Sequence, residues 1–216
     1  MPLHDIARPD ICHEHLMLAT PGKLFSAHGW IYELKHDGFR VLVTKCGDVV
    51  RLESRNGRDM SGLFPELLDE IGAIRHDFVA DGELVILDDQ GCPQWDRLQR
   101  RHVLRHTHRI QQTTADEPAV IFAFDLLWLD GTDLRARPLL ERKQALKSAL
   151  PANKRIRYTA HFANSCSDVW RLAVRMGLEG IVAKDVTSTY TAGRSTRWLK
   201  VKTDAGAERD RERRPS

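Results

Sequence analysis

Glu33-Leu34-Lys35-His36-Asp37-Gly38-Phe39-Arg40 is the stretch around which the chain is organised. It follows an apolar run and sets one lysine among carboxylates, a glycine and an arginine. A lysine attacks a phosphate only when it is neutral, and an ordinary pKa of about 10.4 leaves about one amine in a thousand neutral near physiological pH. We therefore predict a nucleotidyl-transfer site in which burial and three cations, Arg40, Lys200 and Lys202, lower the pKa of Lys35. Taken alone, however, Lys-x-Asp-Gly is better explained as a hairpin turn with solvated charges, so the interpretation depends on further motifs.

The composition is that of one soluble globular domain, with 216 residues of which 42% are hydrophobic and 29% charged. A formal net charge of +3 is small, so any nucleic-acid surface must come from local clustering. The four cysteines form no Cys-x-x-Cys pair, which favours free thiols in a reducing cytoplasm. No apolar run reaches the ~18 residues of a membrane span, and no signal peptide is recognisable. We expect a cytoplasmic protein without a membrane partner.

The two ends of the chain are predicted to be less regular than its middle. Residues 1–28 carry three prolines and no sustained period, which indicates an extended, partly ordered lead-in to a domain over 29–203. A metal site in Cys12-His13-Glu14-His15 is disfavoured, because adjacent residues cannot all face one ion. The tail, 204–216, holds four acidic residues and four arginines with almost no apolar side chains, and is predicted to be disordered.

Apolar periodicity, with glycine and proline signals, predicts the elements between these ends. The first three strands are expected to form an antiparallel meander, and the very apolar strand 119–129 should be central and buried. Gly82, inside a strand, indicates a bulge or a close backbone approach. We predict strands at 30–34, 41–44, 49–52, 78–87, 119–129, 156–162, 179–185 and 197–202, helices at 64–74, 139–150 and 167–176, and a polar loop at 111–118.

The segment 94–109 is densely basic and is predicted to be helical in its first half. A helix with such a face suits a phosphate backbone, and a merely solvated face explains it equally well. A metal site at the i, i+4 pair His102 and His106 is a weaker alternative. The arginines concerned are Arg97, Arg100, Arg101, Arg105 and Arg109.

Six motifs in series closely resemble the nucleotidyltransferase motifs of ATP-dependent DNA ligases, nearest to the bacterial end-joining type. Capping enzymes and RNA ligases share the lysine motif, but the run 122–131 reads as DNA ligase. The resemblance implies a mostly antiparallel α+β domain of the ligase nucleotidyltransferase (ATP-grasp-like) type, with the nucleotide cleft between two sheets. The motifs are Lys35-His36-Asp37-Gly38-Phe39-Arg40, Ser54-Arg55-Asn56-Gly57, Asp81-Gly82-Glu83-Leu84-Val85, Phe122-Ala123-Phe124-Asp125-Leu126-Leu127, Glu179-Gly180-Ile181-Val182-Ala183-Lys184 and Trp198-Leu199-Lys200-Val201-Lys202.

The resemblance implies that Lys35 attacks the α-phosphate of ATP, expels pyrophosphate and holds AMP as a phosphoramidate. AMP then passes to the 5′-phosphate of nicked or broken double-stranded DNA, and a 3′-hydroxyl seals the nick. Asp37 and Glu179 would hold magnesium, or manganese, at the α-phosphate. Phosphate contacts are expected from four cations: Arg40, Arg55, Lys200 and Lys202.

The nucleoside has its own expected contacts. Glu33 can accept a hydrogen bond from the adenine amino group, and the family places Glu83 at the ribose. Phe124 offers an aromatic face to the purine, and Ile181 or Val182 would close the other side. For these three apolar residues, ordinary core packing remains an equally good explanation.

The chain departs from the family pattern after its last lysine motif. Complete ligases continue into an OB-fold domain, whereas fourteen residues follow Lys202. We therefore expect slow self-adenylation and poor nick sealing unless an end-joining or OB-domain partner supplies the missing surface. The competing hypothesis is a non-catalytic module that binds nucleotide or DNA ends.

Overall fold

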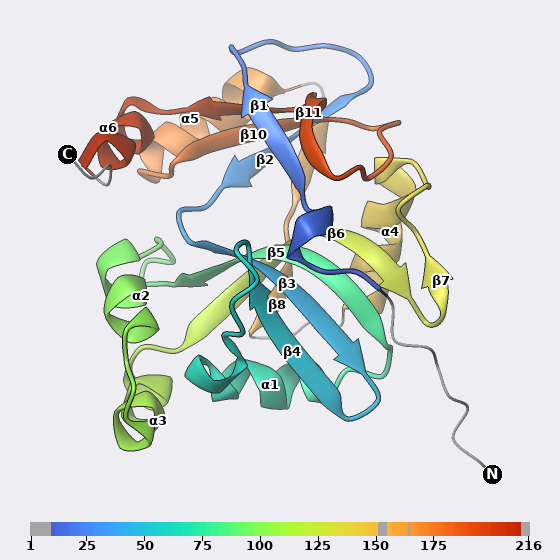
Figure 1. The fold of residues 1–216 in the computed structure, drawn as a ribbon. Helices are drawn as coiled ribbons and strands as arrows, with labels where there is room; N and C mark the ends of the chain where they lie inside the picture. The colour runs from blue at the N-terminus through green and yellow to red at the C-terminus, as the bar shows by residue number, and fades with distance from the viewer. Residues whose placement is uncertain (1–9, 151–154, 164, 213–216) are drawn as a thin grey trace.

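Two mainly antiparallel sheets face each other in the computed structural model, which describes residues 10–150, 155–163 and 165–212 (Figure 1). The α+β class and the two-sheet arrangement are as predicted. None of the described helices is long and apolar enough to cross a membrane.

The first sheet has five strands in the order β1-β11-β10-β2-β9. All neighbouring pairs are antiparallel except β1 with β11, which is parallel. Helix α5 packs on one face of this sheet, where an apolar cluster joins the two. The elements are β1 Met17–Pro21, β2 Trp30–Lys35, β9 His161–Ala163, α5 Cys166–Arg175, β10 Gly180–Asp185 and β11 Gly193–Lys202.

The second sheet runs β4-β3-β5-β6-β7, and β8 pairs with β6 in parallel. Its main apolar core lies against α1, α2 and α4, and a second cluster joins the two sheets through residues such as Leu42, Leu127 and Trp198. The elements are η1 His13–His15, β3 Phe39–Cys46, β4 Val49–Ser54, η2 Ser61–Leu63, α1 Pro65–Gly72, β5 Phe78–Ile86, α2 Trp95–His102, α3 Thr107–Asp116, β6 Ala119–Leu129, β7 Thr132–Asp133, α4 Leu139–Ala149 and β8 Ile156–Tyr158.

Several local predictions are confirmed. The hairpin β3–β4 forms, β6 is buried between β5 and β8, and the β5–β6 register shifts between Asp81 and Gly82, where the bulge was expected. The meander is wrong for its first strand, because β2 pairs with β10 and β9 in the other sheet. The chain therefore crosses from one sheet to the other between Lys35 and Phe39, at the lysine motif itself.

Two other predictions fail for reasons of context. The polar loop 111–118 lies mostly in α3, and the single strand 156–162 is divided into β8 and β9, which belong to different sheets. In the second case tertiary pairing overrides local preference, because β8 pairs with β6 and β9 pairs with β2. Within the lead-in, Met17–Pro21 forms the extended strand β1, which joins the edge of the first sheet.

The predicted disorder of 204–216 is wrong for residues 204–212, which form helix α6, Asp204–Glu212. Thr203 begins this helix, because its Oγ1 accepts a hydrogen bond from Gly206 N at 3.0 Å. Two charged side chains of α6 contact the domain: Arg209 donates to the Gly177 carbonyl, and Asp210 pairs with Lys202. Residues 213–216 lie outside the described part.

Candidate active site

A cavity of about 690 Å³ opens between the two sheets. The lysine motif forms its centre because the chain passes there from β2 to β3. Among its lining residues are nine that the sequence predicts for the site: Glu33, Lys35, Asp37, Arg40, Arg55, Glu83, Phe124, Glu179 and Lys200.

Strand register explains how three motifs meet. β10 lies between β2 and β11, and pairs Gly180 with both Lys35 and Lys202. Two residues further along, on the same face of the sheet, Val182 pairs with Glu33 on one side and with Lys200 on the other. Residues directly opposite in antiparallel strands share a face, so both lysines of β11 lie on the same face as Lys35, as their alternation predicts.

Lys35 is held between carboxylates. Its Nζ lies 2.5 Å from Glu179 Oε2, and Lys202 Nζ lies 2.7 Å from the other oxygen, Glu179 Oε1. Burial lowers the pKa of Lys35, but the charges of Glu179, Glu83 and Asp37 outweigh it, so the pKa is raised. The predicted lowering of this pKa is wrong for the nucleotide-free protein, in which Lys35 is an ammonium ion.

The lysine that pairs with Val182, Lys200, behaves in the opposite way. Burial and the charges of Lys202 and Lys35 lower the pKa of Lys200, and Glu179 and Asp210 only partly oppose them. This cation therefore lacks a full complement of negative charge, and a phosphate oxygen would supply it.

The turn after Lys35 brings β5 into the site. A Cβ on Gly38 would lie 2.2 Å from the Leu84 carbonyl oxygen, so no other residue fits there without moving β5. Gly38 N donates to Glu83 Oε1 at 3.1 Å. Burial raises the pKa of Glu83 to about 7, with Glu179 adding to the rise and Lys35 opposing it. The rise therefore reflects the removal of this carboxyl from water more than the charges around it.

Glu33 lies at the buried end of the cavity between two lysines. Lys184 Nζ is 2.7 Å from Glu33 Oε2, and Lys143 Nζ contacts Oε1. Burial alone would raise the pKa of Glu33, but the two lysines lower it, so the group is a carboxylate. Lys143 was missed from the sequence. Its signal was its position on the buried face of α4, with Leu139 and Leu146 at helical spacing.

The aromatic wall of the cavity is built around Lys184. Its Nζ lies 4.4 Å from the Phe124 ring centroid and 4.1 Å from that of Trp198. Burial lowers the pKa of Lys184, with Glu33 opposing the shift. Of the two branched residues considered from the sequence, Val182 lines the cavity. Ile181 faces the other way and is fully buried in the cluster against α5, so its assignment to the nucleotide site is not supported by its position.

The two predicted arginines occupy different environments. Arg40 forms an ion pair with Asp81, through Nη2 to Oδ2 at 2.6 Å, and donates to the Met17 carbonyl. Its guanidinium lies 5.5 Å from the Phe124 ring centroid, so it also supports the aromatic wall. Arg55 is exposed at the rim, on the loop after β4.

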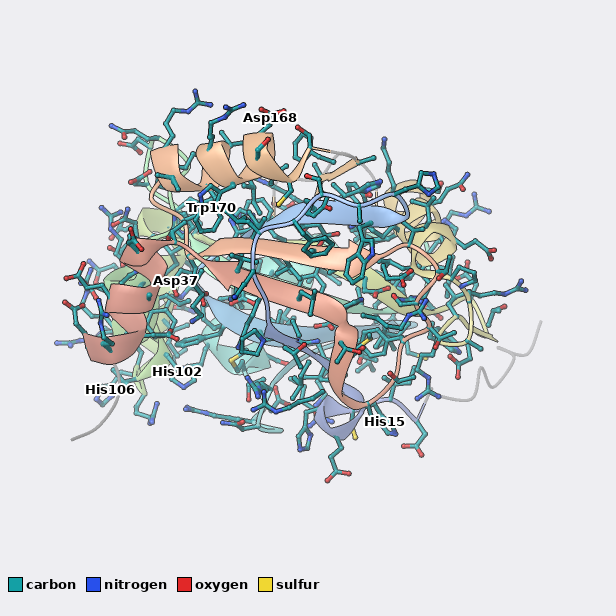
Figure 2. All side chains as sticks on the ribbon, turned by 90° about the horizontal axis from the view of Figure 1, so that it is seen from above. His15, Asp37, His102, His106, Asp168 and Trp170 are labelled. Atoms are coloured by element: carbon teal, nitrogen blue, oxygen red, sulfur yellow. The ribbon has the colours of Figure 1, made fainter. Side chains whose placement is uncertain are left out.

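The two predicted metal ligands each face a cation. Arg209 Nε lies 3.1 Å from Asp37 Oδ2, and Glu179 pairs with two lysines as described. Figure 2 shows Asp37 beside α6, the helix that carries Arg209. Within the described ranges no group of three or more His, Cys, Asp or Glu side chains is placed to hold a metal ion.

The basic segment divides into buried and exposed arginines. Arg101 is fully buried and forms a double ion pair with Glu66, at 2.6 and 2.7 Å, so it belongs to the core. Arg97 and Arg100 lie 3.6 and 3.5 Å from Glu117. Arg105 and Arg109 are exposed. Only part of the predicted phosphate-binding face is therefore available to a ligand.

Comparisons with known proteins find DNA ligases. Residues 17–202 match the family described as ATP dependent DNA ligase domain. A probable DNA ligase of Mycobacterium marinum is 35% identical over 175 residues, which cover 80% of this chain and 34% of that protein. The multifunctional non-homologous end joining protein LigD of Pseudomonas aeruginosa is 34% identical over 178 residues, 80% of this chain and 20% of that one.

Solved structures agree. The ligase domain of LigD from M. tuberculosis has a TM-score of 0.73 at 31% identity, with 87% of this chain and 60% of that chain covered. Mycobacterial DNA ligase D, solved with ATP and MES, gives 0.72 at 31% identity, with 87% and 59% covered. The chain spans about a third of the length of the M. marinum relative and less of the LigD protein.

Proposed function

The chain belongs to the ATP-dependent DNA ligase family, and from this premise we propose that it forms a covalent lysyl-AMP at Lys35 and transfers the AMP to a DNA 5′-phosphate. The observation that carries this proposal is that Glu179 pairs with both Lys35 and Lys202, while Lys35 and Glu179 line a cavity large enough for a nucleotide. A nucleophilic amine, a carboxylate and phosphate-binding cations are the groups that this transfer needs.

In the proposed reaction the neutral amine of Lys35 attacks the α-phosphorus of ATP. A P–N bond forms and the bond from phosphorus to the pyrophosphate oxygen breaks. The ammonium loses one proton to solvent before attack and a second as the P–N bond forms, so Nζ keeps one hydrogen in the phosphoramidate. Because Glu179 holds Lys35 as an ammonium ion in the free protein, this contact has to be broken before attack. Lys200, Lys202 and Arg55 would contact the phosphates.

The same cavity offers a place for the nucleoside. Phe124 and Val182 would enclose the purine, and Glu33, at the buried end, would accept from its amino group. Glu83 would bind the ribose. Because its pKa is raised to about 7, the protonated and ionised forms are both populated near neutral pH, and the protonated form can donate as well as accept.

A divalent cation is part of the proposal. Asp37 and Glu179 suit magnesium or manganese by their chemistry, because hard oxygen ligands and phosphate oxygens together complete such a site. Asp37 and Glu179 both line the cavity together with Lys35, where such a cation would lie. Magnesium bound there would neutralise charge at the α-phosphate.

We further propose nicked or broken double-stranded DNA as the substrate, a cytoplasmic role in DNA repair, and end-joining or OB-domain proteins as partners. The P. aeruginosa relative, a multifunctional non-homologous end joining protein, supports this choice. The alternative, a non-catalytic module derived from a ligase, gains nothing from the site, which contains Lys35, Glu83, Glu179 and Lys200 in one cavity.

The test is to incubate the purified chain with ATP and magnesium and to look for acid-labile AMP by intact mass. We expect AMP on the wild type and none on Lys35→Arg, because a guanidinium stays protonated and cannot attack phosphorus. Equal attachment to both proteins would refute the assignment of Lys35. The adenylated protein is then added to a nicked duplex, and transfer of AMP to the 5′-phosphate is followed.

A further inference from the structure

Helix α6 lies at the phosphate end of the cavity, beside the ends of β10 and β11 (Figure 1). Two of its side chains reach residues of the proposed active site. Asp210 lines the cavity and contacts Lys202 Nζ, while Arg209 Nε lies 3.1 Å from Asp37 Oδ2. The helix therefore engages both a phosphate-binding lysine and a metal-binding carboxylate.

The docking of α6 is built into the backbone. A Cβ on Gly206 would lie 2.2 Å from the Glu179 carbonyl oxygen, so the helix can sit at this distance only with glycine there. Arg209 also donates to the Gly177 carbonyl at 3.0 Å. These contacts therefore fix the position of α6 against the segment that carries Glu179.

The charge of Asp210 lies among the lysines that would bind triphosphate. Its burial raises its pKa, but contact with Lys202 and the charges of Lys35 and Lys200 lower the pKa overall. A carboxylate in this place faces the same cations as the β- and γ-phosphates of ATP would face. The Lys202 ammonium has three donors, and Glu179 and Asp210 already each engage it. A triphosphate oxygen that approaches Lys202 therefore meets the like charge of Asp210, so binding is favoured when Asp210 moves away.

Resting on the function proposed above, we propose that Asp210 is a further active-site residue, an internal anion that occupies the triphosphate subsite until ATP displaces α6. Arg209 does the same for Asp37, which it neutralises in the absence of a metal ion. A second cavity, of about 560 Å³, borders the helix on the side of Arg209 and Glu212, so α6 has open space beside it. The affinity for triphosphate is then set partly by the cost of withdrawing α6.

The test uses inorganic tripolyphosphate, which binds the phosphate subsite without any transfer reaction. Asp210→Asn keeps the shape of the side chain and removes its charge. Glu208→Gln is the matched control, because Glu208 lies on the same helix, is exposed, and loses the same charge. Titration calorimetry at low salt should show about three- to tenfold tighter binding to Asp210→Asn than to the wild type, and unchanged binding to Glu208→Gln.

Hydrogen exchange supplies a second measurement. Saturating tripolyphosphate should speed the exchange of the amides over 204–212 in the wild type, because α6 leaves its site. Equal or weaker binding to Asp210→Asn, an equal gain in Glu208→Gln, no binding to any variant, or slower exchange in α6 would each overturn the proposal. These readouts need no lysyl-AMP, so a wild type that binds tripolyphosphate as expected but never attaches AMP would refute the proposed function and leave this inference standing.

Discussion

Lys35 Nζ and Glu179 Oε2 lie 2.5 Å apart, so the proposed nucleophile is an ammonium ion in the nucleotide-free protein. The carboxylates of Glu179, Glu83 and Asp37 raise its pKa in spite of its burial. In the nucleotide-free protein Lys35 is therefore protonated, and it must lose a proton before it can attack ATP.

The first prediction concerns the pH dependence of AMP attachment. Below the pKa of an amine its neutral fraction grows about tenfold for each pH unit, and the pKa of Lys35 is raised. The initial rate of AMP attachment at saturating ATP should therefore rise steadily from about pH 7 to about pH 9. Rates are measured from labelled ATP, with Lys35→Arg as the blank at each pH. A flat profile would show that the amine is already neutral in the ATP complex.

The second prediction concerns the buried charges around Glu33. Glu33→Gln leaves Lys143 and Lys184 without their shared counter-charge, and removing one partner of a buried ion pair costs about 3–5 kcal/mol. Urea unfolding at pH 7 should show a loss of this size. The double variant Glu33→Gln with Lys143→Gln restores the wild-type net charge of this buried cluster. It should recover part of the lost stability. A single variant as stable as the wild type would mean that the carboxylate does not balance the two lysines.

Base selection gives the third prediction. Glu33 can accept from the amino group of adenine, whereas guanine presents a carbonyl oxygen at that position, and a buried polar mismatch discriminates strongly. We expect the wild type to attach AMP from ATP and to attach little GMP from GTP at equal concentrations. Comparable labelling by the two nucleotides would remove Glu33 from the base-binding site.

The fourth prediction concerns His36, whose ring stacks on Phe122 with centroids 4.0 Å apart. Its Nδ1 has no hydrogen-bond partner in the described part of the chain, and burial, with Lys35, lowers its pKa to about 4. The unfolded chain takes up a proton below about pH 6.5, but the folded protein does so only near pH 4. Stability is therefore lost as the pH falls between these values, by at most about 3 kcal/mol because the ring is partly exposed.

His36→Phe keeps the stacked ring and removes the titration. Urea unfolding at about pH 7 and about pH 4.5 should show a smaller loss on acidification for this variant than for the wild type. Equal losses would show that His36 is protonated as easily in the folded protein as in the unfolded chain.

Local sequence patterns predicted most helices and strands and most of the residues that line the cavity. The features that they missed depend on contacts between segments that are distant in the sequence. Trp30–Lys35 has the pattern of a strand, but it pairs with β10 and β9, which lie far along the chain. The sequence of the segment does not indicate which strands it pairs with. The sequence motif identified Lys35 as a site residue, whereas Lys143 could be recognised only from its position on the buried face of α4. Composition alone suggested disorder for 204–216. Helix α6 forms because Gly206, Arg209 and Asp210 find partners on the domain, and composition carries no information about those partners.

The fifth prediction separates the two kinds of arginine in the basic segment. Arg105 and Arg109 are exposed, so replacing both by alanine should change stability by less than about 0.5 kcal/mol. Arg101→Ala, by contrast, strands the buried carboxylate of Glu66 and should cost about 3–5 kcal/mol. If the exposed pair contacts DNA phosphates, each lost contact lowers the slope of log affinity against log salt by about 0.9.

Binding of a nicked duplex is measured by fluorescence anisotropy over a range of salt concentrations. The Arg105→Ala/Arg109→Ala variant should bind more weakly at low salt and with a slope smaller by up to about 2. Arg171→Ala is the control, because Arg171 is an exposed arginine on α5. Asp168 of the same helix lies at the top of Figure 2, whereas His106 lies at the lower left. An unchanged slope in the double variant, or an equal change in the control, would mean that the segment 94–109 is a solvated face and that DNA is bound elsewhere on the domain.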